Sequence, residues 1–228
     1  MMARIKQFLI AERGVALIEL AFVLPFIFLL LWGSIEITRY ITIAQRVDKS
    51  AYTIADIVSQ YLPATPARAA GEISQAALQD DVFPQLRRLL SPHDAEGDRI
   101  AILTSVRNEG GRLLVKWQLA GGGSLGGTAV RSLVNGAGPA LDPGVRNSPA
   151  NFSGDAAALL TGPSGMAEGE NMIVAEVFFH YRPLLRRLLL SNRTGEQLDI
   201  GEAILVRRLF IRPRRGDLDQ LPPSFGGV

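Results

Sequence analysis

A single apolar run near the N-terminus constrains this chain more than any other feature. It extends from Gly14 to Gly33 or Ile35, and Glu19 is the only charged residue in it. At 1.5 Å rise per residue, about twenty helical residues span about 30 Å, the thickness of the hydrocarbon core of a bilayer. We therefore expect a transmembrane helix over residues 15–35, with the lipid bilayer as a partner.

The charges before this run predict its orientation. Arg4, Lys6 and Arg13 precede it, against the single acid Glu12. The positive-inside rule then makes residues 1–14 a cytoplasmic basic leader and places the remainder outside the cytoplasm. An ordinary secretory signal peptide is the alternative, but the run is longer than the 7–15 residues of a signal core and no clean Ala-x-Ala site follows it.

The helix is predicted to continue beyond the membrane as an amphipathic extension over residues 36–62. Glu36 and Arg39 are spaced to pair on one helix face. An apolar stripe then recurs at steps of three and four residues, as in an amphipathic helix. Its members are Val47, Ala51, Ile54, Val58 and Tyr61. The stripe packs either on the protein's own domain or on other subunits, and Pro63 and Pro66 end the helix.

Composition excludes several classes of site. The 228 residues contain no cysteine, which excludes disulfides, thiol catalysis and cysteine-based zinc or iron–sulfur centres. The net charge of +2 gives no reason to expect a nucleic-acid partner. After the helix, about 165 residues remain, enough for one domain with a modest core.

Residues 63–228 are predicted to form a small α+β domain with an antiparallel sheet. A helix is expected over residues 67–91, interrupted around Pro84. Alternating and β-branched apolar residues then predict four strands. These strands cover residues 100–106, 113–119, 172–181 and 203–211, the first two joined by a turn at 108–111. Residues 120–165 are rich in Gly, Ser, Pro and Asn, and we expect a Gly-rich surface loop there.

The exported domain offers little chemistry. His93 and His180 lack metal-ligand spacing, no Gly-x-Ser-x-Gly motif occurs, and no Lys-Ser or Lys-Thr follows the glycines near residue 121. We expect no catalytic residue, metal or cofactor, and hence not an enzyme. An anchored enzyme would require His180, Glu176 and a third polar group to converge in a pocket.

A basic cluster near the C-terminus has two interpretations. It is either a contact patch for acidic proteins, peptidoglycan-associated polymers or lipid headgroups, or the solvated end of a strand. Its members are Arg207, Arg208, Arg212, Arg214 and Arg215.

The N-terminal region resembles a known family. A basic leader, Gly14 and an apolar segment with Glu at the fifth position resemble the class III signal peptide of type IV pilins and pseudopilins. The continuation from Glu19 to Pro25, with residues 35–39 and 55–60, is similar to TadE/TadG-like pseudopilins of tight-adherence (Flp-type) pilus systems. The hairpin, the aromatic strand ending in Tyr181 and the terminal Arg-Pro-Arg resemble the periplasmic parts of such proteins.

This resemblance implies a role for individual residues. A prepilin peptidase would cut between Gly14 and Val15, and Glu19 would become the fifth residue of the mature chain, able to pair with the new amine of its own or a neighbouring subunit. Pro25 marks either a kink used in helix packing or an ordinary transmembrane proline. Leu20 stands where major Flp-type pilins carry Tyr after the glutamate, which favours the larger pseudopilin class.

The sequence thus predicts a minor pseudopilin-like protein of a bacterial inner membrane, single-pass, with a periplasmic domain, that helps assemble an adhesive pilus or its secretion machinery. The implied partners are the prepilin peptidase, other pilin-like subunits and the inner-membrane platform. Whether the protein enters the filament, primes it or stays in the membrane is left open. The alternative is an uncleaved bitopic protein whose periplasmic domain binds a ligand or an adhesin partner.

Overall fold

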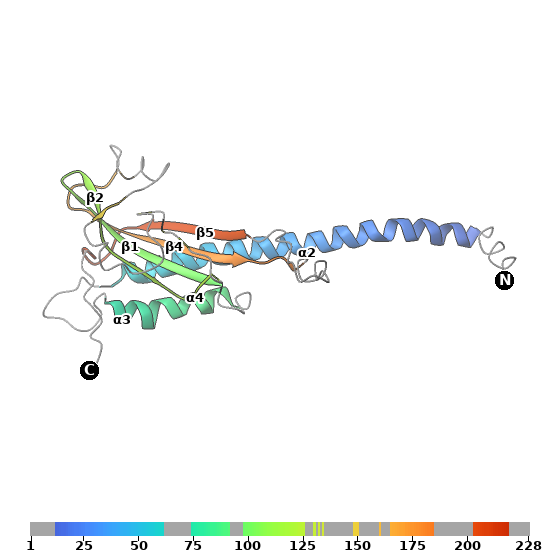
Figure 1. The fold of residues 1–228 in the computed structure, drawn as a ribbon, viewed down its shortest axis with the longest axis horizontal. Coiled ribbons are helices and arrows are strands. Elements are labelled where there is room, and N and C mark those ends of the chain that lie inside the picture. The colour runs from blue at the N-terminus through green and yellow to red at the C-terminus, as the bar shows by residue number, and fades with distance from the viewer. Residues whose placement is uncertain are drawn as a thin grey trace, which may run out of the picture. The chain divides into compact units, whose positions relative to one another are not determined.

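A computed structural model describes residues 12–61, 74–91, 98–125, 130, 132, 134, 148–150, 160, 165–184 and 203–218 (Figure 1). Contacts divide the chain into two compact units. One comprises Met1–Thr42 and Pro183–Ile200, and the other comprises Ile43–Arg182 and Gly201–Val228.

The helix α2 (Glu12–Ser59) is 48 residues long and is a single element. Every side chain from Val15 to Leu31 in its N-terminal part is exposed. Among the described residues, α2 is the one helix long and apolar enough to cross a membrane. The predicted long N-terminal helix is confirmed, and it ends at Ser59, three residues before the predicted end at residue 62.

The predicted amphipathic stripe lies in the second unit and packs on the protein's own domain. Val47, Ile54 and Val58 have no exposed surface, and Ala51 is 3% exposed. Tyr61, just beyond the helix, is partly buried against the same core. Burial, and secondarily the charge of Asp81, raises the pKa of the Tyr61 phenol.

The predicted helix over residues 67–91 is found in three consecutive pieces, α3 (Gln75–Ala77), the π-helical turn η1 (Leu78–Val82) and α4 (Phe83–Leu90). The hydroxyl of Ser74 caps α3 by accepting a hydrogen bond from the Ala77 amide at 3.0 Å. Pro84 lies in the first turn of α4, where its missing N–H costs least. The expected interruption therefore occurs immediately before Pro84; residues 67–73 lie outside the described part.

The sheet has five strands in the order β3-β2-β1-β4-β5, and each neighbouring pair of these strands is antiparallel. The predicted α+β class is thereby confirmed. The long strands are β1 (Arg99–Glu109), β2 (Arg112–Gly121), β4 (Asn171–Tyr181) and β5 (Ala203–Ile211), and β3 is the two-residue Ser148–Pro149. Gly110 and Gly111 form the β1–β2 turn, both at positive φ.

A β-bulge in the first hairpin decides which face the residues of β2 occupy. The register pairs Ser105 with Trp117 but Val106 with Val115, so Lys116 is the extra residue. Trp117 consequently belongs to the core under the helices, whereas Val115 belongs to a core on the opposite face. Without the bulge both side chains would point to the same face.

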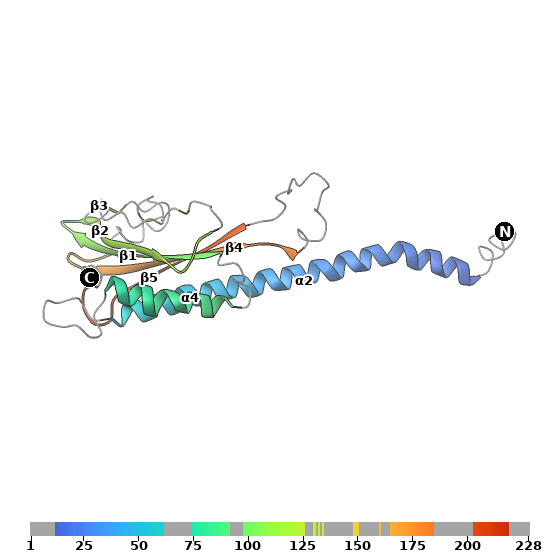
Figure 2. The same cartoon turned by 60° about the horizontal axis from the view of Figure 1, so that its bottom comes forward.

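Both faces of the sheet are covered. Figure 2 shows the C-terminal part of α2 with α3 and α4 on one face, where residues such as Leu103, Trp117 and Ile173 form the larger core. The other face carries two smaller cores. These contain buried residues of the Gly-rich segment, namely Leu125, Val130, Val134 and Leu160. At these positions the segment packs as a cover on the sheet, which differs from the expected surface loop.

Candidate functional site

The residues of the predicted processing site lie in the first turns of α2. The helix begins at Glu12, so Gly14 and Val15 are both helical. Val15 is 50% exposed and Glu19, one turn further, is exposed as well. No hydrogen bond or ion pair of Glu19 is found within the described part of the chain. Glu19 is therefore an exposed carboxylate on an otherwise apolar helix surface.

Pro25 lies inside α2, and its surroundings are bulky and exposed. Phe22 is 71% exposed and Phe26 is 69% exposed. A helix that is apolar on all sides is typical of a membrane segment or of a helix packed among others. In this part of α2, the described residues of the chain bury none of that surface.

Glu36 and Arg39 follow directly after the apolar run. The Glu36 carboxylate accepts a hydrogen bond from the Leu184 backbone N–H at 3.1 Å, within the first unit. Both Glu36 and Arg39 have further contacts, and their mutual pairing stays a prediction.

The five arginines of the predicted contact patch lie on β5 and just after it, and four of them pair with carboxylates of this chain. Arg207 pairs with Asp48, Arg208 with Glu176 at 2.9 Å, Arg212 with Glu170 at 2.8 Å, and Arg214 with Asp56 at 2.5 Å. Arg215 is exposed. Two of these pairs tie β5 and the following residues to α2. The contact patch stays a prediction, and an anionic partner would have to compete with these carboxylates.

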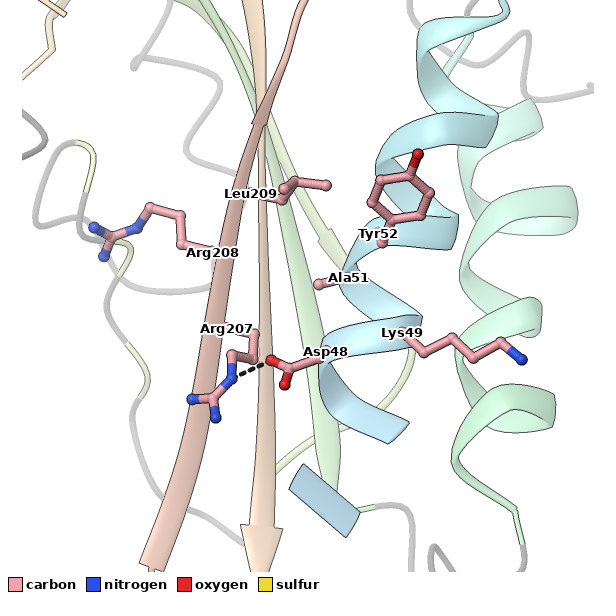
Figure 3. A pocket seen from close by; sticks show the side chains of 7 residues that line it. All are labelled: Asp48, Lys49, Ala51, Tyr52, Arg207, Arg208 and Leu209. Atoms are coloured by element: carbon pink, nitrogen blue, oxygen red, sulfur yellow. Dashed lines mark hydrogen bonds and ion pairs between the residues drawn. The ribbon is translucent and has the colours of Figure 1, made fainter. Parts of the chain in front are cut away.

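A shallow depression lies between α2 and β5 (Figure 3). Ala51, Tyr52 and Leu209 supply its apolar surface, and the Asp48–Arg207 pair bridges the two elements. Tyr52 is 59% exposed. The side chain of Arg208 points away from α2 in this view. The depression thus combines an apolar surface with one ion pair.

The buried carboxylate of Glu176 is a feature whose partners the sequence did not reveal. Its side chain has no exposed surface, although β4 is otherwise nearly all apolar. Its Oε1 pairs with Arg208, its neighbour in the register of β4 and β5, and its Oε2 accepts a hydrogen bond from the Ser132 hydroxyl at 2.5 Å. Ser132 comes from the Gly-rich segment, so the network joins that segment to the sheet.

Neither Glu176 nor His180 lines the depression of Figure 3. His180 lies four residues further along β4, and its backbone N–H donates to the Asp98 carbonyl at 2.9 Å. Within the described residues, no group of three His, Cys, Asp or Glu side chains is placed to hold a metal ion. His93 lies outside the described residues.

Residues 14–56 match the family model of TadE-like proteins. The matched residues all lie within α2 and include Glu19, Pro25, Glu36 and Arg39, so the suspected resemblance is confirmed for this helix. Searches of curated proteins and of solved structures found no match.

Proposed function

Starting from the match between α2 and TadE-like proteins, we propose that this chain is a non-enzymatic minor pseudopilin-like protein. It helps assemble a tight-adherence (Flp-type) pilus or its membrane machinery after a prepilin peptidase cuts between Gly14 and Val15. Its partners are that peptidase, other pilin-like subunits and the inner-membrane platform. The N-terminus lies in the cytoplasm and the sheet domain lies in the periplasm.

One observation carries the proposal. The matched residues include the N-terminal part of α2, which exposes its apolar side chains from Val15 to Leu31 on all sides and leaves Glu19 without a partner among the described residues. A bilayer satisfies the apolar surface, but a carboxylate inside it costs about 2–4 kcal/mol unless a cation pairs with it. A neighbouring subunit's free amine supplies such a cation in an assembly.

A second candidate is an uncleaved bitopic protein whose periplasmic domain binds a ligand or an adhesin partner. The helical conformation of Gly14 and Val15 favours this candidate, since α2 begins at Glu12. Proteases act on extended backbone, so a helical site is a poor substrate. Cleavage at this site requires the first turn of α2 to unwind. A glycine lowers that cost, since it is among the poorest helix formers.

The mass of the protein isolated from cells with a matching prepilin peptidase separates the two candidates. We expect a mature chain that begins at Val15, and a retained leader in a Gly14→Leu variant made under the same conditions. An intact N-terminus in the wild-type chain, with the peptidase shown to be active on another substrate, would exclude processing and leave the bitopic alternative.

Replacement of Glu19 tests the assembly role. We expect Glu19→Ala to insert into the membrane at normal levels, because it removes the only charge from the apolar run, and to abolish or strongly reduce piliation. The matched control is Glu12→Ala, which removes the acid on the other side of the cut. Normal pili in cells carrying Glu19→Ala would argue against an assembly role for this carboxylate.

A further inference from the structure

The strand β5 ends the described sheet on one side, and the bonds of its neighbour β4 show which way its backbone groups point. The His180 N–H donates to the Asp98 carbonyl at 2.9 Å, on the β1 side of β4. Backbone groups alternate in direction along a strand, so the N–H and C=O groups of Phe179 and Val177 point towards β5. Within the described residues, β5 has no second neighbouring strand.

Alternate residues of β5 therefore direct their backbone groups out of the sheet. The β4–β5 register pairs Phe179 and Val177 with residues 205 and 207, whose backbone groups consequently face β4. Ile204, Val206 and Arg208 present theirs at the edge. In agreement with this direction, the Arg207 Nη1 group donates to the Val206 carbonyl at 3.0 Å. Such a row of N–H and C=O groups is a template for another extended chain.

The depression of Figure 3 borders this edge, between β5 and α2. The exposed Tyr52, with Ala51 and Leu209, gives it an apolar surface. A strand added to β5 directs every second side chain towards α2, the face on which Arg207 and Leu209 lie. The edge thus offers backbone hydrogen bonds and the depression receives side chains, which are the two requirements of strand addition.

The charges at this edge indicate the chemistry of the added strand. β5 contains two arginines and no acidic residue. Arg208 pairs with the buried Glu176, whereas at the depression Arg207 and Lys49 accompany one carboxylate, that of Asp48. A second copy of β5 would bring two more arginines to the same edge, where like charges repel. Charge complementarity therefore favours a strand that carries acidic side chains.

We propose that β5 is a docking edge for an extended acidic segment of another protein, which adds a further strand to the sheet. An apolar side chain of this segment lies in the depression beside Tyr52 and Leu209, and a carboxylate two residues along lies beside Arg207. A backbone N–H of the segment replaces the Arg207 guanidinium at the Val206 carbonyl, and the guanidinium pairs with the incoming carboxylate. The proposal concerns the sheet domain alone and does not depend on leader cleavage, membrane insertion or pilus assembly.

The probe is a fluorescein-labelled, C-terminally amidated peptide of the sequence Thr-Glu-Thr-Val-Thr-Glu-Thr, whose glutamates and valine share one face when extended. Fluorescence anisotropy measures its binding to the full chain in detergent. We expect saturable binding that protects the amides of Ile204, Val206 and Arg208 from hydrogen exchange. A peptide with lysine in place of both glutamates should bind at least about tenfold more weakly.

Two further peptides distinguish strand addition from simple charge attraction. Each is N-methylated at alternate amides, one peptide along each edge of the extended chain. Strand addition uses one edge only, so one peptide should bind like the parent and the other at least about tenfold more weakly. Equal binding of the two would overturn the proposal, as would the absence of saturable binding by the parent peptide or equal binding of the lysine peptide.

Val206→Pro tests the same edge from the protein side. Its N–H points away from β4, so proline removes an edge donor without breaking a β4–β5 hydrogen bond. We expect the parent peptide to bind at least about tenfold more weakly to Val206→Pro and to Arg207→Glu, and normally to the matched control Val206→Ala, which keeps the N–H. Unchanged binding to a folded Val206→Pro variant would contradict strand addition. Protection of these amides without peptide, increasing with protein concentration, would overturn the proposal in favour of a second copy.

Discussion

At the scale of single residues, the fully buried carboxylate of Glu176 needs the most compensation from its neighbours in the sheet domain. A fully buried carboxylate costs several kcal/mol unless a cation and hydrogen-bond donors compensate for its lost hydration. Arg208 and the Ser132 hydroxyl provide both. Since Arg208 faces Glu176 across the β4–β5 register, a shift that places Leu209 opposite Glu176 would bury the carboxylate without its cation. The pair therefore opposes that shift in register.

Truncation of this pair should destabilise the domain asymmetrically. We expect Arg208→Met to cost about 3–5 kcal/mol, because it leaves Glu176 buried and uncompensated. Glu176→Leu should cost less, since the Arg208 side chain is 18% exposed and can move towards water. The double variant should be more stable than Arg208→Met, as two apolar side chains of similar volume replace the ions.

Urea unfolding of the full chain in detergent measures these differences through the fluorescence of buried Trp117, in a Trp32→Phe background. The exposed Arg215 supplies the matched control, and Arg215→Met should change stability by less than about 0.5 kcal/mol. If Arg208→Met and Arg215→Met changed the free energy of unfolding equally, the buried pair would contribute no more to stability than an exposed arginine.

At the scale of elements, local sequence patterns were sufficient for the long helix and the four long strands. The strand predicted over residues 203–211 matches β5 at both ends, and the one over 172–181 differs from β4 by one residue. These segments are rich in β-branched and aromatic residues and are bounded by turn residues, so the pattern and the tertiary structure agree.

Features that depend on contacts distant in sequence could not be predicted in this way. Lys116 looks like any residue of an alternating strand, and only the register with β1 identifies it as the bulge. Likewise, the partners of Glu176 lie 44 residues before it and 32 residues after it. The buried residues of the Gly-rich segment have no periodicity of their own, because the sheet, not the local backbone, sets their spacing.

The residues after β5 show the same limitation. Leu218 is fully buried, and its carbonyl accepts hydrogen bonds from the Trp117 indole and the Ser105 hydroxyl, each at 2.7 Å. The Arg214 N–H donates to the Ser59 carbonyl at the end of α2, at 2.9 Å. This stretch was predicted only as a basic terminus. In addition, Arg214 and the buried Leu218 connect this stretch to α2 and to the strands β1, β2 and β4.

At the scale of the whole molecule, the two units use apolar side chains in opposite ways. The sheet domain covers both faces of its sheet, whereas the N-terminal part of α2 exposes Phe22, Phe26 and their neighbours. Water is a poor solvent for such a helix, since each fully exposed large apolar side chain forgoes about 1.5–3 kcal/mol. Bilayer insertion or packing among other helices is the arrangement consistent with this surface.

The direction of insertion predicted from the charges around the helix is testable in this cysteine-free chain. We expect Arg112→Cys to react with a membrane-impermeant maleimide in spheroplasts. The second variant, Gln7→Cys, is made in cells without prepilin peptidase so that the leader is retained. We expect it to react only after lysis. We expect Arg4, Lys6 and Arg13 to hold the leader in the cytoplasm, because positively charged flanks are not translocated readily. Glu substitutions at these three positions should increase labelling of Gln7→Cys in spheroplasts.

Two outcomes would contradict the predicted topology. Labelling of both single-cysteine variants in intact spheroplasts would mean that α2 does not span the membrane. Labelling of Gln7→Cys alone would mean that the orientation is the reverse of the predicted one and that the sheet domain lies in the cytoplasm.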